Sequence, residues 1–304
     1  MHWIFLSLTG AFAQAVGAAI KKKALQTSGM NNIIGFLSFA FAGIIFWVLF
    51  ITGSGSFWMG DLSPLFWQAM AWYAGLNILA VWFMYRALDI AEFNHLMPYM
   101  TVTSLSLVVP PMIFLGESPS LLSFGGIALI VCGAIAMNYK GSMALDERAL
   151  KQGDQRRANR TGVWYFLVTA LCFTFTPTAQ KIAVQESSVL FASFVVHSLI
   201  ALGFLVILLV LRERSKLSSV LRDSDKREFL MAVVAAGAVV VLENGSINAA
   251  LGQASVAYVF AFKRMMPFFA FVIGIVYFRE RTDLRKKFVA TALMVVGALA
   301  MTLF

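Results

Sequence analysis

The sequence predicts an all-α integral membrane protein of ten transmembrane helices, arranged as an inverted repeat of two five-helix units. Three observations predict this class. Of the 304 residues, 60% are hydrophobic and only 13% are charged, which lies outside the usual range of soluble domains. Apolar segments of membrane-spanning length follow one another along the chain, and short motifs of the first half recur in the second half in the same order.

Ten segments are long and apolar enough to cross a bilayer. A bilayer core of about 30 Å needs about 20 apolar residues per helix, and helical backbone satisfies its own hydrogen bonds there. In the first segment the lysines follow the apolar run, so we expect a retained span and not a secretory signal. The ten expected spans are Trp3 to Ile20, Asn31 to Gly53, Pro64 to Tyr85, Phe93 to Leu115, Leu121 to Asn138, Gly162 to Gln180, Val189 to Leu211, Phe229 to Ala250, Ser255 to Phe278, and Phe288 to Phe304.

Repeated motifs divide the chain into two halves. "KKALQTS" recurs as "KIAVQES", "RALDIA" as "NAALGQA", and "FLGESPS" with Glu117 as "YFRERTD" with Glu280. These matches predict a first five-helix repeat over residues 1–139, a basic cytoplasmic linker over 140–161 and a second repeat over 162–304. Because five is an odd number, the second copy crosses the membrane in the opposite sense, which makes the repeat inverted.

With these motifs the chain resembles the ten-helix EamA-type members of the drug/metabolite transporter (DMT) superfamily. The resemblance covers almost the whole chain and implies a basket of helices around a central cavity that performs secondary transport without ATP hydrolysis. The residues agree, because the sequence has no P-loop, no G-x-G-x-x-G and no H-E-x-x-H motif. We therefore expect neither a cofactor nor a metal site, and Cys132 and Cys172 are expected to serve only packing.

Positive charge predicts the orientation. Of the 24 lysines and arginines, 21 follow odd-numbered spans. The positive-inside rule then places the basic loops in the cytoplasm and both termini outside the cell (inner) membrane. The net charge of +9 is explained by this asymmetry, so no nucleic-acid partner is expected.

Ionisable residues inside spans are the candidate site. At a rise of about 1.5 Å per residue, Glu243, His197 and Lys263 all lie about 10–12 Å from the predicted extracytoplasmic end, with Arg264 beside them. One alternative is structural: Glu243 neutralises one cation and locks two helices together. Two cations against one carboxylate leave one positive charge without a counter-charge. We therefore favour the interpretation that a bound anion supplies it.

The substrate class follows from these cations. Lys263 and Arg264 resemble the Lys-Arg pair in the ninth helix of sugar-phosphate and triose-phosphate translocators, which implies phosphate binding, but the fourth span holds no lysine to complete such a clamp. A carboxylate or an amino acid is equally compatible. Gln14 and Asn77 could line the same cavity or form helix-to-helix hydrogen bonds, whereas Lys181 is expected to reach the lipid headgroups.

The leading hypothesis is a secondary transporter, exporting or exchanging a small anionic or zwitterionic metabolite by alternating access, and not an enzyme. A flippase of a phospho-lipid carrier is one alternative, and a membrane-embedded lipid-modifying enzyme is another, although the three histidines suggest no catalytic constellation. Expected partners are the small-molecule substrate, the lipid bilayer, and coupling protons or a counter-substrate. The chain is expected to be a monomer or a homodimer.

Overall fold

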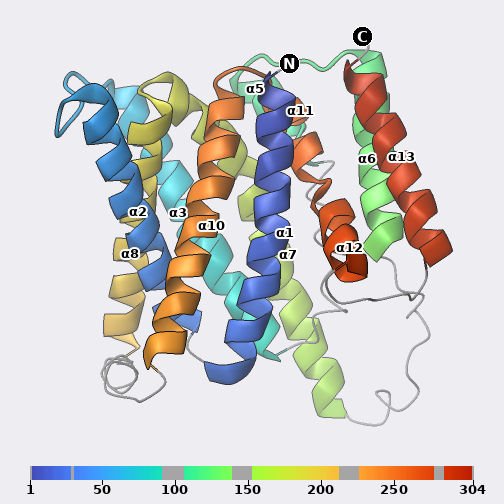
Figure 1. The fold of residues 1–304 in the computed structure, drawn as a ribbon, viewed down its shortest axis with the longest axis horizontal. Helices are drawn as coiled ribbons and strands as arrows, with labels where there is room; N and C mark the ends of the chain where they lie inside the picture. Colours follow the sequence, from blue (N-terminus) through green and yellow to red (C-terminus); the bar gives the residue numbers. More distant parts are fainter. Residues whose placement is uncertain are drawn as a thin grey trace. The chain divides into compact units, whose positions relative to one another are not determined.

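A computed structural model describes residues 2–28, 31–90, 106–138, 153–211, 226–276 and 284–302 (Figure 1). The first part of the predicted fourth span, the linker up to residue 152 and Glu280 lie outside these ranges. The described residues form helices joined by turns, with no strand among them. The helices are α1 (His2–Ser28), α2 (Asn31–Ser54), α3 (Pro64–Ile90), α5 (Val109–Phe114), α6 (Leu121–Asn138), α7 (Gly153–Gln185), α8 (Val189–Val210), α10 (Lys226–Leu251), α11 (Val256–Lys263), α12 (Met266–Val276) and α13 (Leu284–Thr302).

Length and hydropathy confirm the all-α membrane class. Five segments of the described residues are long and apolar enough to cross a bilayer, and two shorter apolar helices accompany them. The count of ten spans stays a prediction. The five segments are Asn32–Ser54, Arg160–Gln185, Val189–Val210, Phe229–Leu251 and Val256–Ile273.

Helix α7 begins earlier than its apolar segment. It starts at Gly153 and therefore includes nine residues of the expected linker. The added residues are mostly polar, but Gln, Arg and Ala are good helix formers, so an apolar span can continue as a helix beyond the hydrocarbon. Hydropathy alone marks where the apolar stretch begins, and this is a poor guide to where the helix begins.

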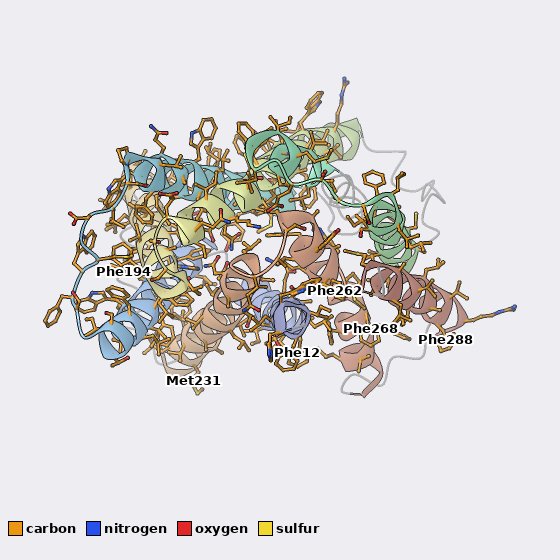
Figure 2. The ribbon with its side chains drawn as sticks, turned by 90° about the horizontal axis from the view of Figure 1, so that it is seen from above. Phe12, Phe194, Met231, Phe262, Phe268 and Phe288 are labelled. Atoms are coloured by element: carbon orange, nitrogen blue, oxygen red, sulfur yellow. The ribbon has the colours of Figure 1, made fainter. Side chains whose placement is uncertain are left out.

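The expected ninth span is two helices instead of one. Helix α11 ends at Lys263 and α12 begins at Met266; Figure 2 labels Phe262 and Phe268 on either side of the break. Proline has no backbone N–H, so Pro267 cannot donate the helical bond to the carbonyl of Lys263. Tighter bonds, each to the carbonyl three residues earlier, close the turn instead: the Arg264 N–H donates to Ala261 O at 3.1 Å and the Met265 N–H donates to Phe262 O at 3.0 Å.

The described helices belong to two compact units. Unit 1 comprises residues 1–78 and 179–253, and unit 2 comprises residues 79–178 and 254–304. Helices α3 and α7 run from one unit into the other, and in α7 the division directly follows Pro177 and Thr178. Each unit thus combines segments from both halves of the chain. The division into two sequence repeats is a separate relation and stays a prediction.

In unit 1, α1 packs on α10 and α2 packs on α8. In Figure 1 both pairs run antiparallel, and each pair takes one helix from each half of the chain. Large aromatic side chains fill the interior, with Phe46, Phe66 and Phe191 fully buried. Apolar side chains such as Phe12 and Met231 point outward in Figure 2 and are exposed, as a lipid-facing surface requires.

In unit 2, α6 packs closely against α13. A β-carbon at Gly126 would stand 2.6 Å from the carbonyl oxygen of Gly297, and one at Gly297 would stand 2.6 Å from that of Gly126. Neither glycine can therefore carry a side chain without moving the backbone. This close approach is the small-residue packing by which membrane helices gain van der Waals contact.

Candidate functional sites

A chain of buried hydrogen bonds joins three helices of unit 1. The Gln180 amide of α7 donates to Asn248 Oδ1 of α10 at 2.6 Å, and Asn248 Nδ2 donates to Ser193 Oγ of α8 at 2.7 Å. The Ser193 hydroxyl in turn donates to Val189 O at 2.6 Å. All three of the linked side chains are buried. Since a buried amide is stable only when hydrogen-bonded, this network fixes how the three helices pack.

His197 lies one turn further along α8 and is 1% exposed. Its Nδ1 is 2.6 Å from Ser193 O. Because a carbonyl oxygen can only accept a hydrogen bond, Nδ1 carries the proton and Nε2 has the lone pair in the neutral ring. The imidazole packs against two rings of α2, with ring centroids 5.9 Å from Phe39 and 5.1 Å from Phe46.

Glu243 of α10 is the acidic group of the same region. It lies within electrostatic range of both His197 and Tyr73, a buried residue of α3. The Tyr73 side chain also lies close to Asn248 of the amide network. A carboxyl group, an imidazole and a phenol therefore lie in one region of unit 1, about 12–14 Å by helical rise from the ends of α3, α8 and α10 that lead into this region.

Lys181 lies elsewhere than expected. The sequence suggested that its ammonium group reaches the lipid headgroups, but the side chain is only 8% exposed. It follows Gln180 in α7, directly beside the amide network. The expectation was wrong because position near a span end does not show whether a helix face meets lipid or neighbouring helices.

Lys263 and Arg264 belong to unit 2, at the break between α11 and α12. Both side chains are half-buried. The Lys263 ammonium lies 5.3 Å from the centroid of the Phe260 ring, a distance at which the ring's negative face attracts a cation. The break thus places two cations within a span, at the negative end of α11 and next to the amino end of α12.

A carboxylate positions the start of α11. Glu117, which follows α5, accepts a hydrogen bond from the Val256 N–H at 2.8 Å. Two residues further on, the Tyr258 hydroxyl donates to Ser123 Oγ of α6 at 3.0 Å. Glu117 was noted in the sequence only as a repeat marker. In the structure it anchors the half-helix that carries the cations, and its charge complements the positive end of that helix.

The structure brings together some of the expected site residues. His197 and Glu243 lie in one region of unit 1. Gln14 and Asn77 belong to the same unit; Asn77 donates to Tyr73 O of its own helix at 2.8 Å, and Gln14 is half-buried. The expected pairing of Glu243 with a cation of the ninth span joins residues of different units and stays a prediction.

Sequence reasoning missed the amide network. Gln180 and Asn248 fall at the ends of their expected spans, where polar residues are ordinary, and Ser193 is common in membrane helices. One signal could have pointed to them: the stretch "ENGSIN" places Asn244 and Asn248 one helical turn apart within an apolar segment. Their difference is visible only in the structure, because Asn244 donates to Val240 O of its own helix at 3.1 Å.

Comparisons with known proteins support this fold. The EamA-like transporter family matches residues 160–303. A solved structure, described only as the crystal structure of a protein, is similar with a TM-score of 0.72 at 14% sequence identity, over 99% of this chain and 97% of that chain. At this identity the likeness shows the fold alone. A search of curated proteins finds no significant match.

The fold and its apolar helices define a multi-pass membrane protein. Its second part, residues 160–303, is similar to the EamA-like transporter family.

Proposed function

We propose that this protein is a secondary transporter of a small anionic or zwitterionic metabolite, such as an amino acid, a carboxylate or a phosphorylated compound, and that Lys263 and Arg264 bind its negative group. The observation that carries the proposal is the break in the ninth span at these two residues. Placing a charged side chain at the centre of a bilayer costs about 2.5–3.5 kcal/mol, and a continuous apolar helix would offer these two cations no ligand to offset that cost.

Interrupted helices are suited to ion binding inside membranes. At a break, backbone groups that a regular helix would use internally become available to a ligand, and the amino end of the second half-helix favours an anion. In this chain α12 supplies the amino end, while Lys263 and Arg264 supply full positive charges next to it. A carboxylate or phosphate oxygen would exchange its hydration for these donors.

Alternating access would follow from motion of the two compact units. Helices α3 and α7 connect them, and the division of α7 lies next to Pro177, where a helical hydrogen bond is missing. The driving force would be an ion gradient or a counter-substrate. The proposal places the protein in the cell (inner) membrane with its basic loops in the cytoplasm, on the strength of the charge asymmetry.

Uptake into proteoliposomes tests the proposal. Radiolabelled glutamate, malate and glucose 6-phosphate represent the three candidate chemistries, each offered with a proton gradient or with the same compound inside, and without ATP. We expect at least one probe to be transported. Replacing both Lys263 and Arg264 by Gln should lower its uptake by an amount equivalent to about 2–5 kcal/mol of binding energy, since a buried charge pair with the substrate is lost.

A matched control separates this loss from a general effect of charge. Arg160→Gln removes an exposed arginine at the start of an apolar segment and should leave uptake unchanged. Full transport by the folded double variant would show that the cations only hold helices together. A strict requirement for ATP would exclude secondary transport.

A further inference from the structure

Unit 2 has a surface cluster of arginine and tryptophan side chains that the break between α11 and α12 does not use. It lies where the last part of α3, residues 79–90, meets the start of α7, on the side that the charge asymmetry assigns to the cytoplasm. We propose that Arg86 and Arg160 bind the headgroup of an anionic phospholipid, with Trp82 and Trp164 at the boundary to its acyl chains. This lipid site is independent of the proposed transport function, and it has no part in uptake.

Two contacts define how the two helix ends lie against each other. The Thr169 hydroxyl of α7 donates to Ala80 O of α3 at 3.2 Å, and the ring centroids of Phe83 and Tyr165 are 5.6 Å apart. The residue number on α7 falls as the number on α3 rises, so the two helices are antiparallel. The end of α3 therefore lies beside the start of α7.

This register places like residues of the two helices at similar depths. Continued three residues beyond Phe83, it brings Arg86 to the level of residues 162–163, about 3–5 Å along the axis from Arg160. Trp82 and Trp164 come out within about 5 Å of one level in the same way. In both helices the arginine is one turn nearer the membrane surface than the tryptophan. Because tryptophan favours the boundary between hydrocarbon and headgroups, the arginines reach the level of the lipid phosphates.

The guanidinium group of Arg86 is held in a position suited to phosphate. Its central carbon lies over the Trp82 ring, 5.5 Å from the centroid, and the side chain is exposed. A guanidinium over an aromatic ring can still donate hydrogen bonds through the N–H groups in its plane. These N–H groups match two oxygens of one phosphate, which is the bidentate contact that distinguishes arginine from lysine.

Helix α7 supplies the second cation on a rigid support. Arg160 is exposed, and Trp164, one turn further along, is 62% exposed. The helix begins at Gly153, so Arg160 lies within regular helix and not in a loop. A helical backbone keeps the position of Arg160 relative to Arg86 fixed, so that one headgroup can contact both cations.

Charge favours an anionic headgroup over a zwitterionic one. The two helix ends, residues 86–90 and 153–160, contain four arginines and two aspartates. The excess positive charge complements a phosphate that no choline group neutralises, because a zwitterionic headgroup would bring its own cation to the arginines. Basic residues next to a membrane span bind anionic lipids for this reason.

Lipid binding to the purified full-length chain tests the site. Native mass spectrometry of the delipidated protein in detergent gives the Kd of added phosphatidylglycerol and of phosphatidylcholine with the same acyl chains. We expect the wild type to bind the first phosphatidylglycerol about tenfold or more tightly than phosphatidylcholine. Arg86→Gln and Arg160→Gln should each weaken phosphatidylglycerol binding about fivefold, which corresponds to about 1 kcal/mol per arginine, and leave phosphatidylcholine binding unchanged.

Control variants separate this site from general positive charge. Arg285→Gln removes another exposed arginine of unit 2, at the start of α13, and should leave phosphatidylglycerol binding at the wild-type level. Trp82→Leu removes the ring beside Arg86 without changing the charge and should weaken binding, whereas Trp82→Tyr keeps a ring and should retain it. A loss in Arg285→Gln as large as that in Arg86→Gln, or wild-type binding by Trp82→Leu, would overturn the proposal. Circular dichroism verifies that each variant is folded.

Inorganic phosphate distinguishes a lipid site from a site for a free anion. We expect excess inorganic phosphate to leave phosphatidylglycerol bound, because only a lipid also contacts Trp82 and Trp164 through its acyl chains. Displacement of phosphatidylglycerol by inorganic phosphate would overturn the assignment to a lipid. Equal affinity of the wild type for the two phospholipids would overturn the anionic selectivity and with it the proposal.

Discussion

The two compact units hold their helices together by different means. In unit 1 the contacts between α7, α8 and α10 include side-chain hydrogen bonds that run from Gln180 through Asn248 to Ser193. In unit 2 the pair α6 and α13 meets backbone to backbone at Gly126 and Gly297. Both kinds of contact stabilise helix association inside a membrane. Lipid is as apolar as a leucine side chain, so hydrophobicity alone does not drive membrane helices together.

The two kinds of helix contact differ in the room that they leave for functional side chains. A glycine contact leaves no room for a functional group between the helices, whereas a polar network places donors and acceptors in the interior of unit 1. We call the contact of Gly126 with Gly297 the glycine seam. The cations of unit 2 do not lie in this seam but at the break between the half-helices α11 and α12. Variants of each unit can test this comparison.

The largest effect on stability is expected at the glycine seam. Gly126→Ala would place a β-carbon 2.6 Å from a backbone oxygen, so the helices must separate. We expect a destabilisation of about 1–3 kcal/mol, measured by thermal or denaturant unfolding in detergent. Gly125→Ala is the matched control, because nothing lies within 4 Å of its new β-carbon. Equal stability of the two variants would refute close packing of α6 on α13.

A smaller loss is expected in unit 1. Asn248→Ala removes the amide that links Gln180 and Ser193 and leaves both without this partner, which should cost about 1–2 kcal/mol of unfolding free energy. Asn244→Ala, one turn earlier in the same helix, removes only a bond to its own backbone and should cost less. If the two asparagine variants unfold alike, the network does not hold the helices of unit 1 together.

The smallest effect is expected at the start of α11. Glu117→Ala removes the carboxylate that accepts the Val256 N–H, and we expect a loss of about 0.5–1 kcal/mol in unfolding free energy. Glu117→Gln keeps an oxygen acceptor without the charge and should fall between the wild type and Ala. Transport measured on both variants would show whether this anchor also positions Lys263. An effect of Gln as large as that of Ala would mean that charge, and not the hydrogen bond, matters here.

Hydrophobicity determined most of what the sequence could predict. The start of α2 at Asn31, both ends of α6 and the start of α8 at Val189 coincide with the expected spans, because the bilayer imposes length and polarity on each crossing segment locally. The motifs repeated in both halves also led to the family that residues 160–303 match.

Which polar residues contact one another became clear only from the packing of the helices. Hydropathy along the chain treats Asn244 and Asn248 alike and places Lys181 at a membrane surface, although Asn248 joins three helices and Lys181 is buried. It also gave the ninth span as one helix, while the structure ends α11 at Lys263. The physical reason is that span formation depends on the local cost of exposing polar groups to lipid. The pairing of those groups depends instead on which faces of distant segments pack together, and no local pattern records this.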